Sequence, residues 1–126
     1  MLMAFLLSLM MVASSPHVLT IPLEMMPDPI EVQKEEWINN LQLCENINKV
    51  PWIFDTNGKK SYADFMFQMD TWISYGKKFG ATRNNISSST LQRQVVRSML
   101  DSGGWRNWYN CGKMLNKTIG KYGEDM

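Results

Sequence analysis

The stretch Ser61–Gly76, SYADFMFQMDTWISYG, carries the clearest secondary-structure signal in the chain. The Ser at its start and the Asp three residues later resemble a helix capping box, and the closing glycine is typical of a helix C-cap. Between them, apolar side chains recur at the spacing of one helix face. The pattern predicts an amphipathic helix over residues 61–76 whose buried stripe is Tyr62, Phe65, Met66, Met69, Trp72 and Ile73.

Three further helices are predicted around this stretch. Asp28-Pro29-Ile30-Glu31 is a strong helix start, with an acidic N-cap followed by proline at the first helical position. That helix should run to about Lys49. A second is expected from Ser89, as N-cap, to the Gly103-Gly104 pair, and a third over about 105–119.

The predicted fold class is all-α. No segment alternates apolar and polar residues for long enough to suggest a sheet, and residues 50–60 are expected to form a connector with a small aromatic plug at 52–54. The length of 126 residues fits one domain. We therefore expect a small four-helix bundle as a single helical domain over 29–126. Four of the five prolines lie between Pro16 and Pro29, so an extended N-terminal arm is expected at 15–28.

The N-terminal segment differs in kind from the rest of the chain. Residues 1–15 read MLMAFLLSLMMVASS and carry no charged side chain. The apolar run is shorter than the ~20 residues that span a bilayer, and a short apolar run ending in small residues is typical of a secretory signal peptide. We predict a signal peptide at 1–14 and a secreted, extracellular protein. An uncleaved membrane anchor and a buried N-terminal helix are the alternatives.

Secretion determines how the two cysteines are interpreted. An oxidising compartment favours a disulfide between Cys44 and Cys111. Two buried free thiols or an intermolecular bond are the alternatives. The sequons at Asn85 and Asn116 are candidate glycosylation sites, and Asn85 is the better candidate because it lies in a polar loop.

The sequence offers little for catalysis, so a non-enzymatic protein without cofactor or metal is expected. The only histidine, His17, lies near the expected mature N-terminus, where a general base is poorly positioned. Phosphate-loop, zinc-protease, nucleophile-elbow and EF-hand patterns are missing. The carboxylates that stand close together or on one predicted helix are better explained as solvated groups, namely Glu31, Glu35, Glu36, Asp64 and Asp70.

The net charge of +1 hides a division of the chain into two halves. Residues 16–75 hold nine acidic and four basic side chains, whereas residues 76–121 hold one acidic and nine basic side chains. The basic half next to aromatic residues suggests a partner-binding surface. In the alternative, the basic half simply packs beside the acidic half. The candidate binding residues are Arg93, Arg97, Arg106, Lys113, Lys117 and Lys121.

These observations predict a secreted, non-enzymatic helical protein that binds an unidentified extracellular protein. In plan it resembles small secreted proteins of animals, such as insect seminal-fluid and venom proteins, which implies a signalling, reproductive-secretion or venom-like role. A carrier of a small apolar ligand in the bundle interior is one alternative. Peripheral binding to an anionic membrane surface is another. Nucleic acid is not expected as a partner, because no DNA-binding motif is present.

Overall fold

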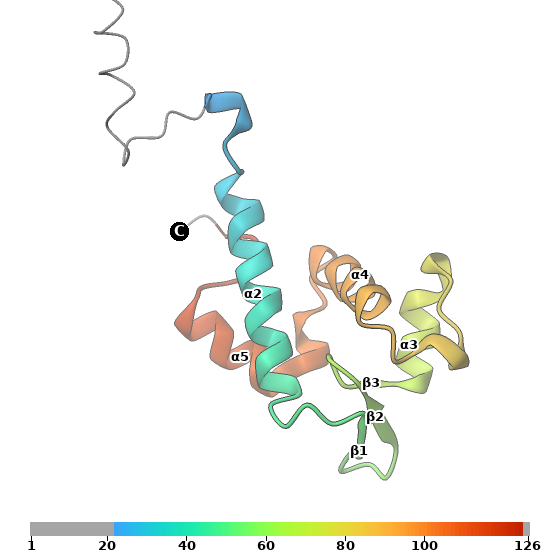
Figure 1. Ribbon diagram of the computed structural model, residues 1–126. Helices are drawn as coiled ribbons and strands as arrows, with labels where there is room; N and C mark the ends of the chain where they lie inside the picture. Colours follow the sequence, from blue (N-terminus) through green and yellow to red (C-terminus); the bar gives the residue numbers. More distant parts are fainter. Residues whose placement is uncertain (1–21, 125–126) are drawn as a thin grey trace, which may run out of the picture.

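The computed structural model describes residues 22–124 (Figure 1). The predicted signal peptide, His17 and the first part of the predicted arm lie outside the described residues. In the described part of the arm, the chain forms a short 3₁₀ turn rather than an extended segment. The elements in chain order are η1 (Leu23–Met25), α2 (Pro29–Glu45), β1 (Trp52–Phe54), β2 (Lys60–Tyr62), β3 (Phe67–Gln68), α3 (Met69–Gly76), η2 (Lys77–Phe79), η3 (Arg83–Asn85), α4 (Ser89–Asp101), η4 (Trp105–Trp108) and α5 (Tyr109–Thr118).

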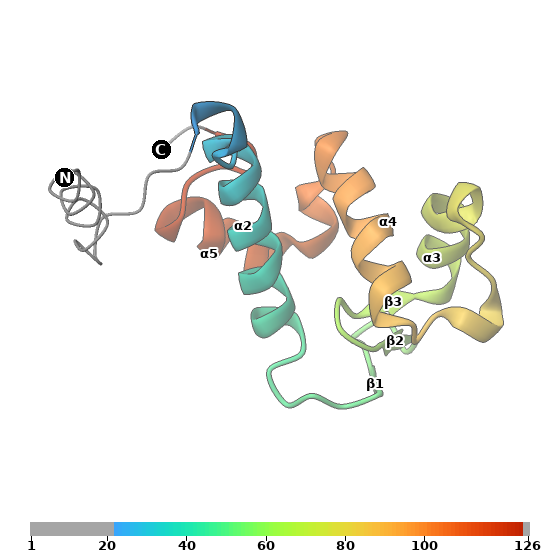
Figure 2. The ribbon, with the colours of Figure 1, turned by 45° about the horizontal axis from the view of Figure 1, so that its top comes forward.

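The fold is mixed α/β, so the prediction of an all-α bundle was wrong. The described residues form four α-helices and a three-stranded antiparallel sheet in the order β1-β2-β3. In the β1–β2 hairpin Ile53 faces Ser61, and Tyr62 of β2 faces Phe67 of β3. The sheet lies at one end of α2 and α4, and its β1–β2 hairpin projects away from the helices (Figures 1 and 2).

The predicted helix over 61–76 was wrong in its first half, because α3 begins only at Met69. Upstream of it the side chains alternate between buried and partly exposed, with Ser61, Ala63, Phe65 and Phe67 on the buried side. Within residues 60–68, only Lys60–Tyr62 and Phe67–Gln68 are strands, and residues 63–66 form the turn between them, with positive φ at Ala63 (57°) and Met66 (52°). The small size of Ser61 and Ala63, together with apolar residues on the other side, disguised this alternation in the sequence.

Polar side chains from the C-cap of α2, from α4 and from η4 hold the turn at 63–66 in place. Gln92 of α4 accepts a hydrogen bond from the backbone N–H of Phe65 (2.9 Å), and Trp108 Nε1 donates to the carbonyl of Phe65 (2.8 Å). Asn46 Nδ2 donates to the carbonyl of Ala63 (3.0 Å). Buried backbone groups need partners, and here distant side chains supply the partners that a helix would have supplied from within.

Helix α2 begins as the sequence predicts and ends four residues early. Asp28 accepts a hydrogen bond from the backbone N–H of Ile30 (3.0 Å). The helix ends at Glu45 because the side chain of Asn46 turns the chain. Its Oδ1 accepts from the backbone N–H of Val50 (2.9 Å), and its Nδ2 donates to the Val50 carbonyl (2.8 Å).

The last two helices differ from their predictions in detail. The N-cap of α4 is Ser88 rather than Ser89. The predicted helix over 105–119 is split into η4 and α5 after Trp108. Gly112 lies inside α5, where a Cβ atom would come within 2.7 Å of Trp105 Cε3. Glycine at this position therefore lets the Trp105 ring lie directly against the helix.

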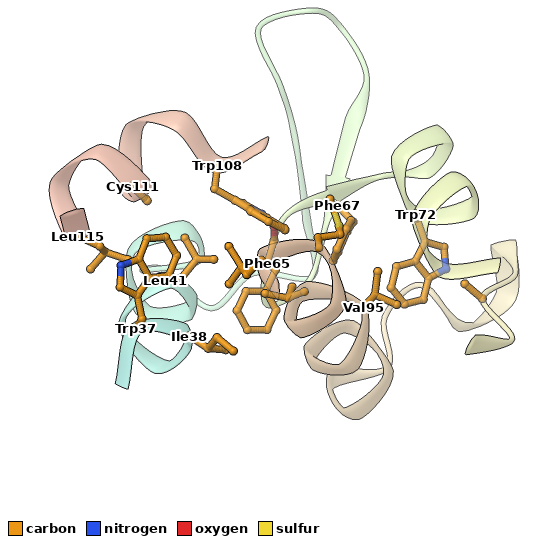
Figure 3. Packing of buried hydrophobic residues seen from close by; sticks show 14 of the residues in the cluster. Trp37, Ile38, Leu41, Phe65, Phe67, Trp72, Val95, Trp108, Cys111 and Leu115 are labelled. Carbon is orange, nitrogen blue, oxygen red and sulfur yellow. The ribbon is translucent and has the colours of Figure 1, made fainter. Parts of the chain in front are cut away.

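The hydrophobic core lies where the helices meet the sheet (Figure 3). Trp37 of α2 is fully buried at one end of the core, and Trp72 of α3 is fully buried at the other. Phe67 lies between, with its ring 5.2 Å from that of Trp72 and 5.7 Å from that of Trp108. The predicted aromatic plug at 52–54 is not part of this core, because its three side chains are exposed.

The predicted disulfide is confirmed. Cys44 near the end of α2 is bonded to Cys111 in the first turn of α5, with an S–S distance of 2.02 Å. The bond joins residues 67 positions apart. It therefore ties the first long helix to the last one.

Replacing both Cys44 and Cys111 with Ser should lower the free energy of unfolding by about 4 kcal/mol, the chain-entropy value for a loop of this length. The reason is that the unfolded chain gains the freedom that the cross-link removes. Urea unfolding of both proteins, followed by circular dichroism, measures the difference. A loss below about 1 kcal/mol would contradict this role.

Candidate functional site

Arg93 and Arg97, two of the predicted partner-binding residues, face α2 within the chain. Arg93 Nη2 lies 3.0 Å from Glu35 Oε1, while Arg97 pairs with Glu31 and Asp101. The hydrogen bond from Arg97 is the main cause that holds the pKa of Glu31 below its usual range. These two arginines therefore pair with acidic residues of the same chain, as in the alternative in which the basic half of the sequence packs beside the acidic half.

Three other predicted basic residues lie on the exposed side of η4 and α5. The Arg106 guanidinium lies 4.8 Å from the ring centroid of Trp105, which stacks on the ring of Tyr109 at 5.9 Å. The Lys113 ammonium lies 5.8 Å from the Tyr109 ring, and Lys117 follows one helical turn later. We call these five residues the η4–α5 surface. Its three cations form no salt bridge with any residue between 22 and 124.

Lys121, the sixth predicted residue, is separate from this surface. Helix α5 ends at Thr118, and Gly120 has a φ of 103°, which turns the chain out of the helix. The backbone carbonyl of Lys121 accepts a hydrogen bond from Gln33 Nε2 (2.9 Å). The C-terminal turn therefore packs on α2 instead of continuing the stripe of α5.

The two sequons lie in different surroundings. Asn85 caps η3, since its Oδ1 accepts from the backbone N–H of Thr82 (2.7 Å) and its Nδ2 donates to the Gly80 carbonyl (2.9 Å). Asn116 lies half-buried on α5. Glycosylation at either position stays a prediction.

A polar cleft lies where the end of α2, the sheet and η4 meet. It has a volume of about 240 Å³. Two carboxyl groups line it, from Glu45, the last residue of α2, and from Asp55, the residue after β1. We call it the Glu45 cleft. Its remaining lining residues are Met66, Phe67, Gln68, Thr71, Asn107 and Trp108.

The two carboxyl groups of the Glu45 cleft have opposite environments. Asp55 accepts hydrogen bonds from the backbone N–H of Thr56 (2.8 Å) and from Ser61 Oγ (2.9 Å), and these bonds hold its pKa below the usual range. Burial, followed by the negative charge of Asp55, raises the pKa of Glu45 to about 7. Near neutral pH the cleft therefore holds one ionised carboxylate and one carboxyl group that is protonated in much of the population.

A pair of this kind is suited to acid–base chemistry. Where the environments of two titratable groups move their pKa values apart, one group serves as the acid and the other as the anion. Residues 22–124 contain no group of three or more His, Cys, Asp or Glu side chains that could hold a metal ion.

The sequence interpretation missed this pair and considered other acidic residues. Glu31 and Glu35, which it assigned to a solvated face, pair with the arginines of α4. Glu45 carried one available signal. It stands near the predicted helix end, where the helix dipole disfavours an anion.

No protein-family model, curated protein or solved structure matches the chain. In the part of the chain that the structure describes, no helix is both long and apolar enough to cross a membrane.

Replacing Glu45 with Gln should stabilise the protein at high pH. The pKa of Glu45 is about 7 in the folded state against an ordinary 4.5, so the folded state binds more protons between these values. The wild type therefore loses stability as pH rises from 4.5 to 7. At pH 8 the variant should be more stable by roughly 2–3 kcal/mol, and at pH 4 the two should be equal.

Urea unfolding at both pH values measures this difference. Glu36→Gln is the matched control, since it makes the same change on an exposed position of the same helix. Equal changes in the free energy of unfolding of the two variants at pH 8 would contradict the raised pKa of Glu45.

Proposed function

We propose that the protein hydrolyses glycosidic bonds in an extracellular carbohydrate, with Glu45 as the general acid and Asp55 as its ionised partner. The observation that carries the proposal is the pair of carboxyl groups in one polar cleft, one hydrogen-bonded and ionised and the other largely buried with a pKa of about 7. The sequence-based expectation of a non-enzymatic protein stays a prediction, and the assay below decides between the two.

Glycoside hydrolysis requires these two groups and few others. A carboxylic acid protonates the leaving oxygen, while a carboxylate acts on the opposite side of the sugar through an oxocarbenium-like transition state. Acyl transfer would need an activated nucleophile and a cluster of oxyanion-binding donors instead. The lining of the cleft supplies the first set of groups: Glu45 and Asp55.

The proposed reaction starts from a protonated Glu45 and an ionised Asp55, the states that these groups have near neutral pH. Glu45 donates its proton to the leaving oxygen while the bond between that oxygen and the anomeric carbon breaks. Asp55 stabilises the positive charge that develops on the sugar ring. Water then supplies a hydroxyl group to the anomeric carbon, and its remaining proton returns to the carboxyl pair, which restores the neutral acid.

The rest of the cleft suits a sugar. Its lining residues include Thr71 and Asn107 beside Glu45 and Asp55, together with the aromatic residue Trp108. Its volume of about 240 Å³ is below the ~300–1,000 Å³ of a pocket for a drug-sized ligand. A single sugar unit of a longer chain therefore fits the cleft best.

The enzyme assay uses fluorescently labelled peptidoglycan, chitin oligosaccharides and hyaluronan. On the substrate that is cleaved, kcat/KM should fall as pH rises above about 7, because Glu45 loses its proton there. Glu45→Gln should lower kcat/KM by at least ~100-fold, while Glu36→Gln should leave it unchanged. The variants are checked for folding by circular dichroism.

Two results would contradict the proposal. One is the absence of hydrolysis on all three substrates. The other is a Glu45→Gln variant that keeps the wild-type rate and pH profile.

A second candidate function, the sequence-predicted binding of an extracellular protein, is supported by the η4–α5 surface. Three cations and two aromatic rings are arranged along one exposed side of η4 and α5. Beside it, a groove between α2 and α5 exposes the apolar side chains of Leu43, Ile47 and Met114. A positively charged strip next to an apolar groove suits a protein partner with an acidic rim and an apolar centre.

Charge reversal at Lys113 and Lys117 should weaken binding to a fluorescent poly-glutamate peptide by about tenfold or more, which equals ~1.4 kcal/mol, and should flatten its salt dependence. The control, Lys77→Glu with Lys78→Glu, makes the same charge change on η2. Fluorescence anisotropy at low and moderate salt measures both. Equal losses of peptide affinity in the two variants would mean that net charge alone determines binding, which would contradict a specific role of the η4–α5 surface. A parallel measurement with anionic vesicles tests membrane binding.

A further inference from the structure

Within residues 22–124, no strand pairs with the second edge of strand β1. It stands at the end of the sheet order. Asp55 N–H donates to the Lys59 carbonyl (2.8 Å), and Ala63 N–H donates to the Pro51 carbonyl (2.9 Å). Positions 51 and 55 therefore point their backbone groups toward β2, as does Ile53 between them. The backbone N–H and C=O groups of Trp52 and Phe54 consequently point to the open edge.

The side chains of β1 are unusual for an open edge. Edge strands are commonly protected by charged residues, proline or a covering element. In β1 all three residues are apolar and exposed, with exposed fractions of 40% for Trp52, 43% for Ile53 and 66% for Phe54. The rings of Trp52 and Phe54 meet edge to face at 5.2 Å, and the Lys60 ammonium lies 4.1 Å from the Trp52 ring centroid.

We propose that a second copy of this chain pairs with β1 along its open edge. The two β1 strands would run antiparallel about a twofold axis at Ile53, which joins the two sheets into one of six strands. In this register Trp52 of each copy lies opposite Phe54 of the other. The outward backbone groups of these residues then form two hydrogen-bonded pairs, with four hydrogen bonds in all.

The sequence of β1 is self-complementary in this register. Trp-Ile-Phe reads as aromatic, aliphatic, aromatic in both directions, as a twofold interface requires. Trp52 and Phe54 of both copies gather on one face, where aromatic cross-strand pairs are favourable. Asp55 lies opposite Pro51, so no two like charges face each other across the new pair.

The area of this interface sets its strength. A fully buried aromatic side chain removes about 150–250 Å² from water, so the exposed parts of Trp52 and Phe54, 40% and 66%, amount to roughly 200 Å² per copy. With Ile53 added, the total stays below the ~1,200 Å² of a standard interface. A contact of this size falls in the weak, transient class, so the dimer should form only at high protein concentration.

The pairing is independent of the proposed reaction. Successive side chains of a strand point to opposite faces, so Asp55 points away from the face that carries Trp52 and Phe54. Its carboxylate is bonded to Ser61 on the other face.

Sedimentation equilibrium over ~1 µM to ~1 mM tests the proposal. The wild type should shift from monomer to dimer, whereas Ile53→Lys should stay monomeric, since it would place two positive charges on the twofold axis. Val32→Lys, on the exposed side of α2, is the matched control and should dimerise like the wild type. A wild type that is monomeric throughout, or an Ile53→Lys variant that dimerises equally, overturns the proposal.

Disulfide trapping tests the register. Two Ile53→Cys chains would have their Cα atoms about 4.5 Å apart on the axis, within the range that a disulfide bridges. Two Phe54→Cys chains would be diagonal neighbours about 7–8 Å apart. Mild oxidation should therefore cross-link Ile53→Cys much faster than Phe54→Cys. Equal rates, or faster cross-linking of Phe54→Cys, would reject this register.

Discussion

The rest of the structure depends on the bond between Cys44 and Cys111. It fixes the end of α2 against the first turn of α5. Two walls of the Glu45 cleft, the end of α2 and η4, adjoin the bonded cysteines in sequence. Glu45 directly follows one cysteine, and Trp108 lies three residues before the other. The same cross-link that stabilises the helices thus places a carboxyl group in a largely buried position next to an indole ring, where its pKa is raised.

The third wall of the cleft is the sheet, which depends on polar contacts of long range. Gln92, fully buried on α4, bonds to the carbonyl of Tyr62 at the end of β2 and to the N–H of Phe65 in the turn between β2 and β3. Trp108 uses its indole N–H on the same turn. Removing a partner from such a buried network leaves unsatisfied groups. Trp108 therefore has two roles, since it anchors the sheet and lines the cleft.

The sequence predicted the parts of the fold that local signals determine. The start of α2 follows from its N-cap, and the presence of α4 follows from the spacing of its apolar residues. The disulfide was predicted from the oxidising compartment that the expected signal peptide implies. The sheet could not be predicted in this way, because its short strands are held by side chains 17 to 43 residues distant. The η4–α5 surface was largely predictable from charge spacing, whereas Arg93 and Arg97 required knowledge of which helix they face.

Glu45 is the residue that most contradicts local stability, and this supports its assignment. It ends a helix, where the dipole disfavours an anion. It is also largely buried, and the negative charge of Asp55 adds to the cost of ionising it. Gln would fill nearly the same space without these costs. Residues that break local rules in an otherwise consistent fold tend to stand at functional sites. An unfavourable carboxyl group that lines the same cleft as an ionised one is therefore the arrangement that the proposed reaction requires.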